Sequence, residues 1–302
     1  MDALSKLKGK RCFITGGTGF IGQSLIAKLT TLGAEVTAPS RGQMNLTEHI
    51  KVEEKIYAAQ PEILFHLAAA GVVLSPGPSN IHDVNVTGTH TLVSAVKKLR
   101  KPPVLILMGS CSEYNNKDSP LLETDELNSL NDYGLSKIKA ADLARKNCQG
   151  LPIRWVRLFN CYGPQEPMSR LLPYIVNQAR SGLPIEVTGG GQLRDFTYVD
   201  DVSEGLIRIA LSAEGATNWE DINLGSGRPI YLKEYIELIK ETLDEFGIKS
   251  DIRYGAKPYR SGEAMIMTPD ITRLHKKLGW RPSTPIKEGV RNTIQFILST
   301  SK

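Results

Sequence analysis

Residues 11–22 read RCFITGGTGFIG, and this stretch decides the fold. An apolar run ends at Thr15, glycines follow at positions 16, 17 and 19, and Gly22 lies within a pattern of helical spacing. Glycine allows the backbone to turn tightly and to approach other groups closely. We therefore predict a buried strand that passes through a glycine turn directly into a helix, as at the start of a β–α–β unit.

The same alternation continues outward from this stretch. Nearly all-apolar runs predict further strands at 34–40, 62–70, 103–110 and 153–163, and amphipathic patterns between them predict helices at 47–60, 83–99 and 132–147. Such strands are typical of a parallel sheet that is covered on both faces. The predicted fold class is α/β: a doubly wound parallel-sheet Rossmann domain with a smaller carboxyl-terminal substrate-binding lobe.

The pattern loosens after Gly163, where turn-rich segments and further helices follow. We predict that residues 1–165 form the Rossmann domain and that residues 195–228 return to it. Residues 166–194 and 229–302 then form the smaller lobe.

Composition narrows the functional classes. The 302 residues carry a net charge of +5 without a Lys/Arg block, which argues against a nucleic-acid binder. No apolar stretch approaches the ~20 residues of a membrane span, and the first residues do not resemble a signal peptide. The four cysteines lack CxxC spacing and the five histidines lack metal-ligand spacing. We therefore expect reduced thiols, a cytoplasmic location, and neither a metal nor a membrane partner.

The glycine turn predicts a dinucleotide site. Its glycines fit both GxGxxG and GxxGxxG, between a strand and a helix, where backbone amides and the helix amino terminus bind a pyrophosphate. The predicted cofactor-binding residues here are Gly16, Gly19, Phe20, Ile21 and Gly22.

The end of the second predicted strand indicates which dinucleotide is bound. An acidic residue there would bind the ribose of NAD, whereas an arginine would meet the 2′-phosphate of NADP. The chain has Ser40 and Arg41, and the first acid is Glu48. We predict NADP as the cofactor, with NAD as the alternative and a surface role for Arg41 the competing interpretation.

Tyr133 and Lys137 lie four residues apart and so on one face of a predicted helix. A nearby ammonium favours the phenolate, so we expect Lys137 to lower the pKa of Tyr133. Such a tyrosine can exchange a proton with a substrate hydroxyl.

Together these motifs resemble the extended short-chain dehydrogenases/reductases that act on nucleotide sugars. The resemblance spans nearly the whole chain and rests on TGGTGFIG (15–22), HLAA (66–69), NVTGT (85–89), YGLSK (133–137), RLFNCYGP (157–164), RDFTYVDDV (194–202) and LGWRP (278–282). It implies that Tyr133 is the catalytic acid/base, that Lys137 binds the nicotinamide ribose, and that Ser110 bonds the reacting oxygen. It also implies cofactor contacts for Ala68 and Ala69, and substrate contacts for Ser110, Cys111, Ser112, Asn160, Arg194 and Arg260; the arginines could instead be surface or ion-pair residues.

The residues after Ser110 bear on the reaction. In dehydratases of this family an acid and a base follow the serine or threonine, but here Cys111 and Ser112 occupy these positions. Glu113 is displaced by one residue, and in an extended segment that places a side chain on the other face. Dehydration is therefore disfavoured, unless a local insertion brings Glu113 into the site.

We predict an enzyme: an NADPH-dependent reductase of a nucleotide-linked 4-keto-6-deoxyhexose with Tyr133 as proton donor. The alternative is a nucleotide-sugar 4-epimerase with bound NAD, followed by a 4,6-dehydratase or a non-catalytic nucleotide-binding protein. The resemblance also implies a homodimer, formed through helices that begin near Asp83 and Tyr133.

Overall fold

A computed structural model describes residues 3–71, 81–147 and 149–300. Its strands are β1 (Arg11–Thr15), β2 (Glu35–Thr37), β3 (Ile63–His66), β4 (Val104–Ser110), β5 (Ile153–Leu158), β6 (Asn160–Tyr162), β7 (Ile185–Glu186), β8 (Leu193–Tyr198), β9 (Trp219–Leu224), β10 (Pro229–Tyr231), β11 (Ile252–Arg253) and β12 (Ile266–Met267). Its α-helices are α1 (Phe20–Thr31), α2 (His49–Ala59), α3 (Gly88–Lys97), α4 (Asp132–Asn147), α5 (Leu171–Arg180), α6 (Val199–Ser212), α7 (Leu232–Glu245), α8 (Thr272–Leu278) and α9 (Ile286–Thr300). The short helical turns are η1 (Ala3–Leu7), η2 (Asp83–Thr87) and η3 (Cys111–Glu113).

The central sheet has six strands in the order β2-β1-β3-β4-β5-β9, and every neighbouring pair is parallel. The chain leaves β1 toward β2 on one side and returns to β3 on the other, so the strand order reverses at β1. Ligands of doubly wound sheets bind at such a reversal, beyond the carboxyl ends of the strands.

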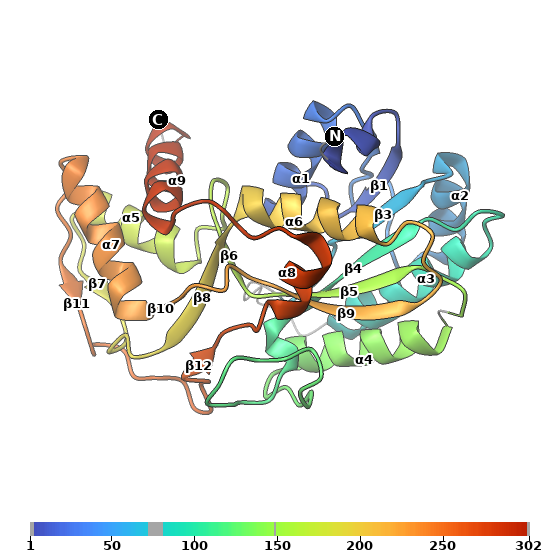
Figure 1. The fold of residues 1–302 in the computed structure, drawn as a ribbon. Coiled ribbons are helices and arrows are strands. Elements are labelled where there is room, and N and C mark those ends of the chain that lie inside the picture. The colour runs from blue at the N-terminus through green and yellow to red at the C-terminus, as the bar shows by residue number, and fades with distance from the viewer. Residues whose placement is uncertain (1–2, 72–80, 148, 301–302) are drawn as a thin grey trace.

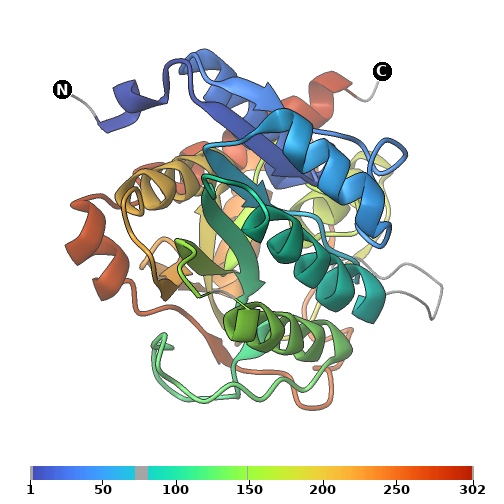
Figure 2. The same cartoon turned by 90° about the vertical axis from the view of Figure 1, so that its right-hand side faces the viewer.

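Helices cover both faces of this sheet (Figures 1 and 2), as its mostly apolar strands require. One layer packs α1, α6 and α8 against one face, through residues such as Leu25, Leu206 and Leu274. The other packs α2, α3 and α4 against the opposite face, through residues such as Ile56, Leu92 and Ala140. The predicted α/β fold with a parallel Rossmann sheet is confirmed.

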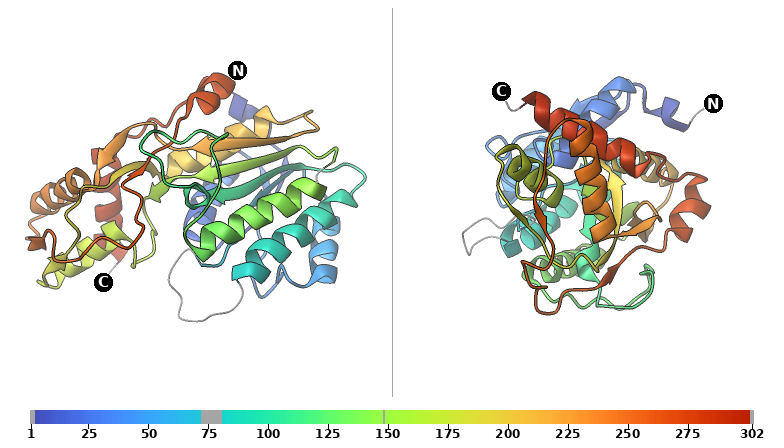
Figure 3. Two further views of the ribbon diagram at one scale, coloured as in Figure 1. Left: turned by 90° about the horizontal axis from the view of Figure 1, so that it is seen from below. Right: turned by 90° about the vertical axis from the view of Figure 1, so that its left-hand side faces the viewer.

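A separate core holds the smaller lobe, which lies beside the sheet domain in Figure 3. It gathers α5, α7 and α9 around aromatic side chains, among them Phe196 and Tyr235, which stack with 3.9 Å between ring centroids. β8 pairs with β6, β10 and β12 at its edge. The exact domain boundaries stay a prediction; α8, from the last quarter of the chain, packs on the sheet rather than in this core.

The predicted strand 153–163 is two strands. β5 lies between β4 and β9, whereas β6 pairs with β8. The chain therefore passes from the central sheet to the small β8 sheet at Phe159. Asn160, the first residue of β6, stands at this transition.

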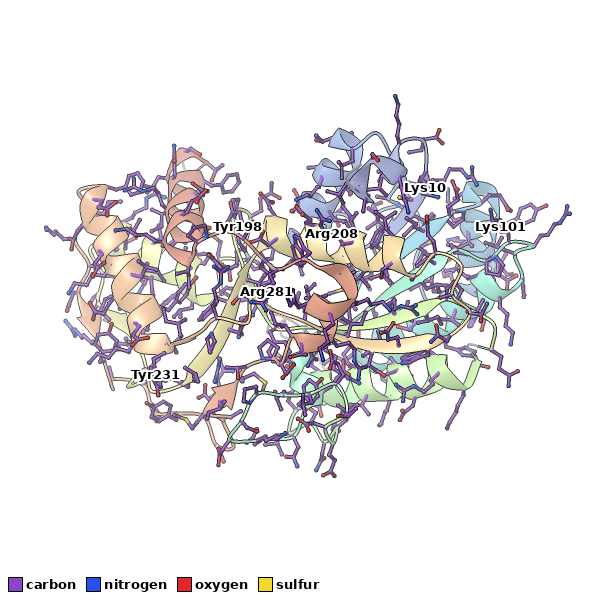
Figure 4. The ribbon with its side chains drawn as sticks, in the orientation of Figure 1. Lys10, Lys101, Tyr198, Arg208, Tyr231 and Arg281 are labelled. Atoms are coloured by element: carbon purple, nitrogen blue, oxygen red, sulfur yellow. The ribbon has the colours of Figure 1, made fainter. Side chains whose placement is uncertain are left out.

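The two ends of the central sheet face different surroundings. Lys10 and Lys101, which precede β1 and β4, lie at the end remote from the small lobe, whereas Tyr198, the last residue of β8, lies near the junction (Figure 4). The carboxyl ends of the parallel strands therefore face the lobe. Within the described residues, no helix is both long enough and apolar enough to span a membrane.

Candidate functional site

A cleft with a volume of about 700 Å³ opens at the carboxyl ends of β1, β3, β4 and β5. The glycine turn forms one wall, and the end of β4 with the start of α4 forms another. Most of the predicted site residues line it: Gly16, Gly19, Phe20, Ile21, Gly22, Ala69, Ser110, Cys111, Ser112, Tyr133, Lys137, Asn160 and Arg260. Segments that are distant in sequence thus meet in one cavity.

Close packing of the backbone requires glycine at two positions of the turn. Gly16 has a φ of +76°, and a Cβ there would lie 2.6 Å from the Ala68 amide nitrogen. A Cβ on Gly22 would lie 2.2 Å from the carbonyl oxygen of Gly16. Among the described side chains, none caps the first turn of α1, so its amides are left for an anion at the cleft wall. Ala68 therefore packs behind the turn, and its neighbour Ala69 lines the cleft.

Ser40 and Arg41 lie in the loop that follows β2. A Cβ on Gly17 would lie 2.9 Å from the Ala38 side chain, which places this loop beside the glycine turn. The Ser40 amide donates to Oε1 of Gln43 at 2.8 Å, and the Ser40 carbonyl accepts from the amides of Gln43 and Met44 at 3.0 Å. Arg41 is exposed on this ordered turn, outside the 700 Å³ cleft.

Ser110, Tyr133 and Lys137 meet at the cleft wall. Ser110 ends β4, and a hydrogen bond between it and Tyr133 acts to lower the pKa of the phenol. Lys137 is buried, its Nζ lies 5.8 Å from the Tyr133 ring centroid, and it donates to the Met108 carbonyl at 2.9 Å. The structure brings all three predicted catalytic residues together.

The predicted direction of the Tyr133 pKa shift is wrong. Burial raises this pKa above its ordinary value, and the nearby Glu113 and Cys111 act in the same direction. Burial also lowers the pKa of Lys137 to about 8, against the opposing effect of Glu113. Removal of both side chains from water disfavours their charged forms, and this desolvation is the largest cause of each shift. Tyr133 is consequently a protonated phenol at neutral pH.

Cys111 and Ser112 line the cleft, but Glu113 does not. Burial raises the pKa of Cys111 to about 11, so its thiol stays protonated at neutral pH. The fully buried Glu113 carboxylate accepts from the Ser110 amide at 2.7 Å and from Nε of Arg157 at 2.7 Å. The expectation that an insertion could bring Glu113 into the cleft is wrong, because its carboxylate is held behind β4.

A second cavity of about 500 Å³ adjoins the first and continues into the small lobe. Both cavities share Asn160, Cys161, Arg170 and Arg260 as lining residues. Asn160 donates to the Asp195 carbonyl at 3.1 Å, which fixes its side chain at the transition between the two sheets. The second cavity is large enough to hold the remainder of a ligand whose first part lies in the first cavity.

Arg194 lines the second cavity but is tied to its wall. Its Nη2 donates to Oε1 of Glu263 at 3.3 Å and to the Ala264 carbonyl at 2.8 Å, and its Nη1 donates to the Met265 carbonyl at 3.3 Å. The side chain therefore braces the segment that also carries Arg260.

Two residues of the cavities were not predicted from the sequence. Glu166 and Arg170 follow β6, and Arg170 lines both cavities. Among the described residues, neither Oε2 of Glu166 nor Nε of Arg170 has a hydrogen-bond partner, although both atoms are buried. Burial raises the pKa of Glu166 to about 8, while Arg170 acts to lower it. Two charges in the turn-rich stretch PQEPMSR (164–170) were the available signal.

Behind the cleft, polar side chains fix the loop after β3. Asn85 accepts from the Ala70 amide at 2.8 Å and donates to its carbonyl at 3.0 Å. The His66 ring bonds Thr15 at 2.7 Å and Thr89 at 2.9 Å, and burial lowers its pKa to about 3. A neutral imidazole therefore ties β1, β3 and α3 together.

Comparisons with known proteins show the family to which the sequence is similar. The model of a family described as "NAD dependent epimerase/dehydratase family" matches residues 12–225. The chain is 30% identical to the UDP-N-acetyl-alpha-D-glucosaminuronate decarboxylase of Bacillus cytotoxicus, over 95% of this chain and 97% of that protein. It is 32% identical to the UDP-glucuronate 4-epimerase of Thermodesulfobacterium geofontis, over 77% and 71% of the two chains.

Solved structures share the fold. The crystal structure of UDP-glucose 4-epimerase from Thermotoga maritima with UDP-glucose superposes with a TM-score of 0.82 at 25% identity, and the match covers 96% of this chain and 99% of that one.

In the described residues, His, Cys, Asp and Glu side chains form no group of three that could hold a metal ion.

Proposed function

Because the chain belongs to the NAD dependent epimerase/dehydratase family, whose members act on nucleotide sugars, we propose that it transfers a hydride between NAD(P) and C4 of such a sugar. The observation that carries this proposal is the meeting of Ser110, Tyr133 and Lys137 with the glycine turn in one cleft. The second cavity offers room for the nucleotide beyond the sugar.

The cofactor fits the residues that would hold it. Gly16 and Gly22 pack against neighbouring backbone and admit no side chain, and the amino terminus of α1, which no described side chain caps, would hold the pyrophosphate. When bound, the nicotinamide supplies or accepts the hydride. Lys137, on the same wall as Tyr133, would bind the nicotinamide ribose.

Within this class, we propose net reduction of a nucleotide-linked 4-keto-6-deoxyhexose. Ser110 would donate a hydrogen bond to the keto oxygen and orient it toward Tyr133. Tyr133 stands beside Ser110 at the cleft wall and carries a proton at neutral pH, so it would be the group that gives a proton to the reduced oxygen.

Elimination is disfavoured at this site. The dehydration of a sugar needs an acid and a base beside Ser110, and Cys111 and Ser112 stand there instead. The Cys111 thiol has a pKa of about 11, and Glu113 is directed into the protein interior. Neither position supplies a base at neutral pH.

NADPH is the proposed reductant. Arg41 stands on an ordered turn beside the glycine turn, and the loop after β2 has no carboxylate before Glu48. An arginine at this place suits a 2′-phosphate, whereas a carboxylate would repel it.

A second candidate is a nucleotide-sugar 4-epimerase with tightly held NAD. It is favoured by the relatives, since the proteins from T. geofontis and T. maritima are both named 4-epimerases. The same Ser110 and Tyr133 would serve it, with the hydride returned to the opposite face of the sugar.

One experiment separates the two candidates. The purified protein is denatured, and any released nucleotide is identified by mass; NADPH oxidation is then followed with a panel of nucleotide-linked 4-keto-6-deoxyhexoses. Reductase activity predicts keto-sugar-dependent oxidation of NADPH. Released NAD, together with interconversion of C4 epimers without added cofactor, would establish the epimerase instead. The absence of both activities would contradict both candidates.

A further inference from the structure

The end of β4 is held from two sides at consecutive peptide groups. Lys137 donates to the Met108 carbonyl at 2.9 Å, and the Ser110 amide donates to Oε1 of Glu113 at 2.7 Å. Gly109 lies between them, and a Cβ there would lie 2.5 Å from Oε1 of Glu113. The carboxylate thus packs directly against the strand whose next residue is Ser110.

Glu113 is itself anchored on its other side. Nε1 of Trp155 donates to its two carboxylate oxygens at 3.1 and 3.0 Å, and Nε of Arg157 donates to Oε2 at 2.7 Å. Arg157 also donates to Asp221 at 3.0 Å. The exposed fractions of the Arg157 and Glu113 side chains are 1% and 0%, so solvent does not screen this pair.

We propose that Glu113 is a positioning residue of the active site, which fixes the Ser110 backbone and, held in place by Trp155 and Arg157, supplies a buried carboxylate whose charge acts on Lys137. The inference rests on the proposed function, because it assigns Ser110 and Lys137 to the reaction. It adds that a carboxylate outside the cleft tunes the charge of a lysine inside it.

Burial raises the pKa of Glu113 itself, whereas the adjacent Arg157, the Ser110 amide and Trp155 act to lower it. Lys137 is influenced by Glu113 and stands near the neutral His66 and the phenol of Tyr133. Tyr133 is influenced by Glu113, Cys111 and Arg170. Burial lowers the Lys137 pKa to about 8, and Glu113 is the group that acts to raise it. Loss of the Glu113 charge therefore lowers the pKa of Lys137 further.

The substitution Glu113→Gln tests the charge, because an amide oxygen can still accept from the Ser110 amide. In protein labelled with ¹³C at lysine Cε, the Lys137 signal is assigned by its loss in Lys137→Arg and followed by NMR from pH 6 to 10. We expect the Lys137 titration midpoint to fall below the wild-type value of about 8, and the alkaline limb of kcat/KM to move to lower pH with it. An unchanged midpoint in folded Glu113→Gln would overturn the proposal.

Two further variants separate positioning from folding. Glu113→Asp keeps the charge but shortens the reach to Ser110, so kcat should fall while the Lys137 midpoint stays near that of the wild type. An aspartate variant with full kcat would also overturn the proposal, and it decides the question if the glutamine variant does not fold. Thr293→Val removes a buried hydrogen bond of the small lobe, 2.7 Å to the Gly289 carbonyl, and should move neither quantity.

The NMR titration does not depend on turnover. A wild-type protein that reduces and epimerises no nucleotide sugar would contradict the proposed function, whereas the response of Lys137 to Glu113→Gln would still be measurable.

Discussion

Arg194 on β8 and Glu263 in the segment before β12 form a salt bridge, with 3.3 Å between Nη2 and Oε1. Oε2 of the same glutamate accepts from the Arg260 amide at 3.2 Å. Arg194 lines the second cavity itself and also holds, through Glu263, the segment that carries Arg260 at the border of the two cavities. Sequence motifs identify both arginines but do not show that Glu263 links them.

Glu263→Gln should weaken substrate binding without weakening cofactor binding. It removes the charge that holds Arg194 and loosens the segment that carries Arg260. We expect KM for the nucleotide sugar to rise about tenfold, equivalent to ~1.4 kcal/mol, with the Kd for NADPH unchanged. Steady-state kinetics and fluorescence titration measure the two. Asp251→Asn, at an exposed ion pair with Arg253, is the control; an equal loss of NADPH affinity would place Glu263 in a general structural role.

Tyr133→Phe should remove the proton donor and leave the ring in place. Turnover should fall roughly 10²- to 10⁴-fold, the usual contribution of general acid catalysis. The affinity for NADPH should stay within a factor of about two, since the ring still packs at the cleft wall. Stopped-flow hydride transfer and fluorescence binding give both values, with the exposed Tyr57→Phe as control. If the variant kept most of its activity, a residue other than Tyr133 would be the proton donor.

Arg41→Ala tests the cofactor choice. Loss of a charged hydrogen bond to a 2′-phosphate costs about 1.5–3 kcal/mol, so the KM for NADPH should rise roughly 10- to 100-fold. The KM for NADH should change little, because NADH has no such phosphate. Arg281→Ala removes another exposed arginine, on the loop before α9, and serves as the control (Figure 4). Equal effects on NADPH and NADH would make Arg41 a surface residue.

The fold could be predicted because its signals are local. The glycine turn, the nearly all-apolar strands and the Tyr133–Lys137 spacing can each be recognised from neighbours within a few residues. The electrostatics could not be predicted, because burial raises the Tyr133 pKa where the sequence showed only a nearby lysine. Glu113 was equally hidden: its partners Trp155 and Arg157 come from β5, more than 40 residues away, and only the paired strands bring them together.

Arg170 is expected to bind an anionic group of the substrate. Its Nε is buried without a partner among the described residues, and its charge acts on Tyr133 and Cys111. Arg170→Met keeps much of the side-chain volume and removes the donors, so KM for the nucleotide sugar should rise roughly 10- to 100-fold. Inhibition by the free nucleoside diphosphate should weaken equally if Arg170 meets the phosphates. Unchanged inhibition with a raised KM would indicate that Arg170 binds the sugar rather than the phosphates. If neither the inhibition nor the KM changed, an anion-binding role would be contradicted.

His66 should make the fold sensitive to acid. Its pKa is about 3 in the folded chain and 6.5 ordinarily, so the unfolded chain binds the proton more readily. The contribution to stability is full above pH 6.5 and falls as the pH drops toward 3; between pH 6.5 and 5 the loss is about 2 kcal/mol. The variant His66→Gln has no titrating group at this position. The excess in unfolding free energy of the wild type over this variant should therefore shrink by that amount as the pH falls from 6.5 to 5. Urea unfolding at several pH values measures it, with the exposed His82→Gln as a control that should follow the wild-type curve. A constant difference between His66→Gln and the wild type would show that the imidazole is not held neutral between Thr15 and Thr89.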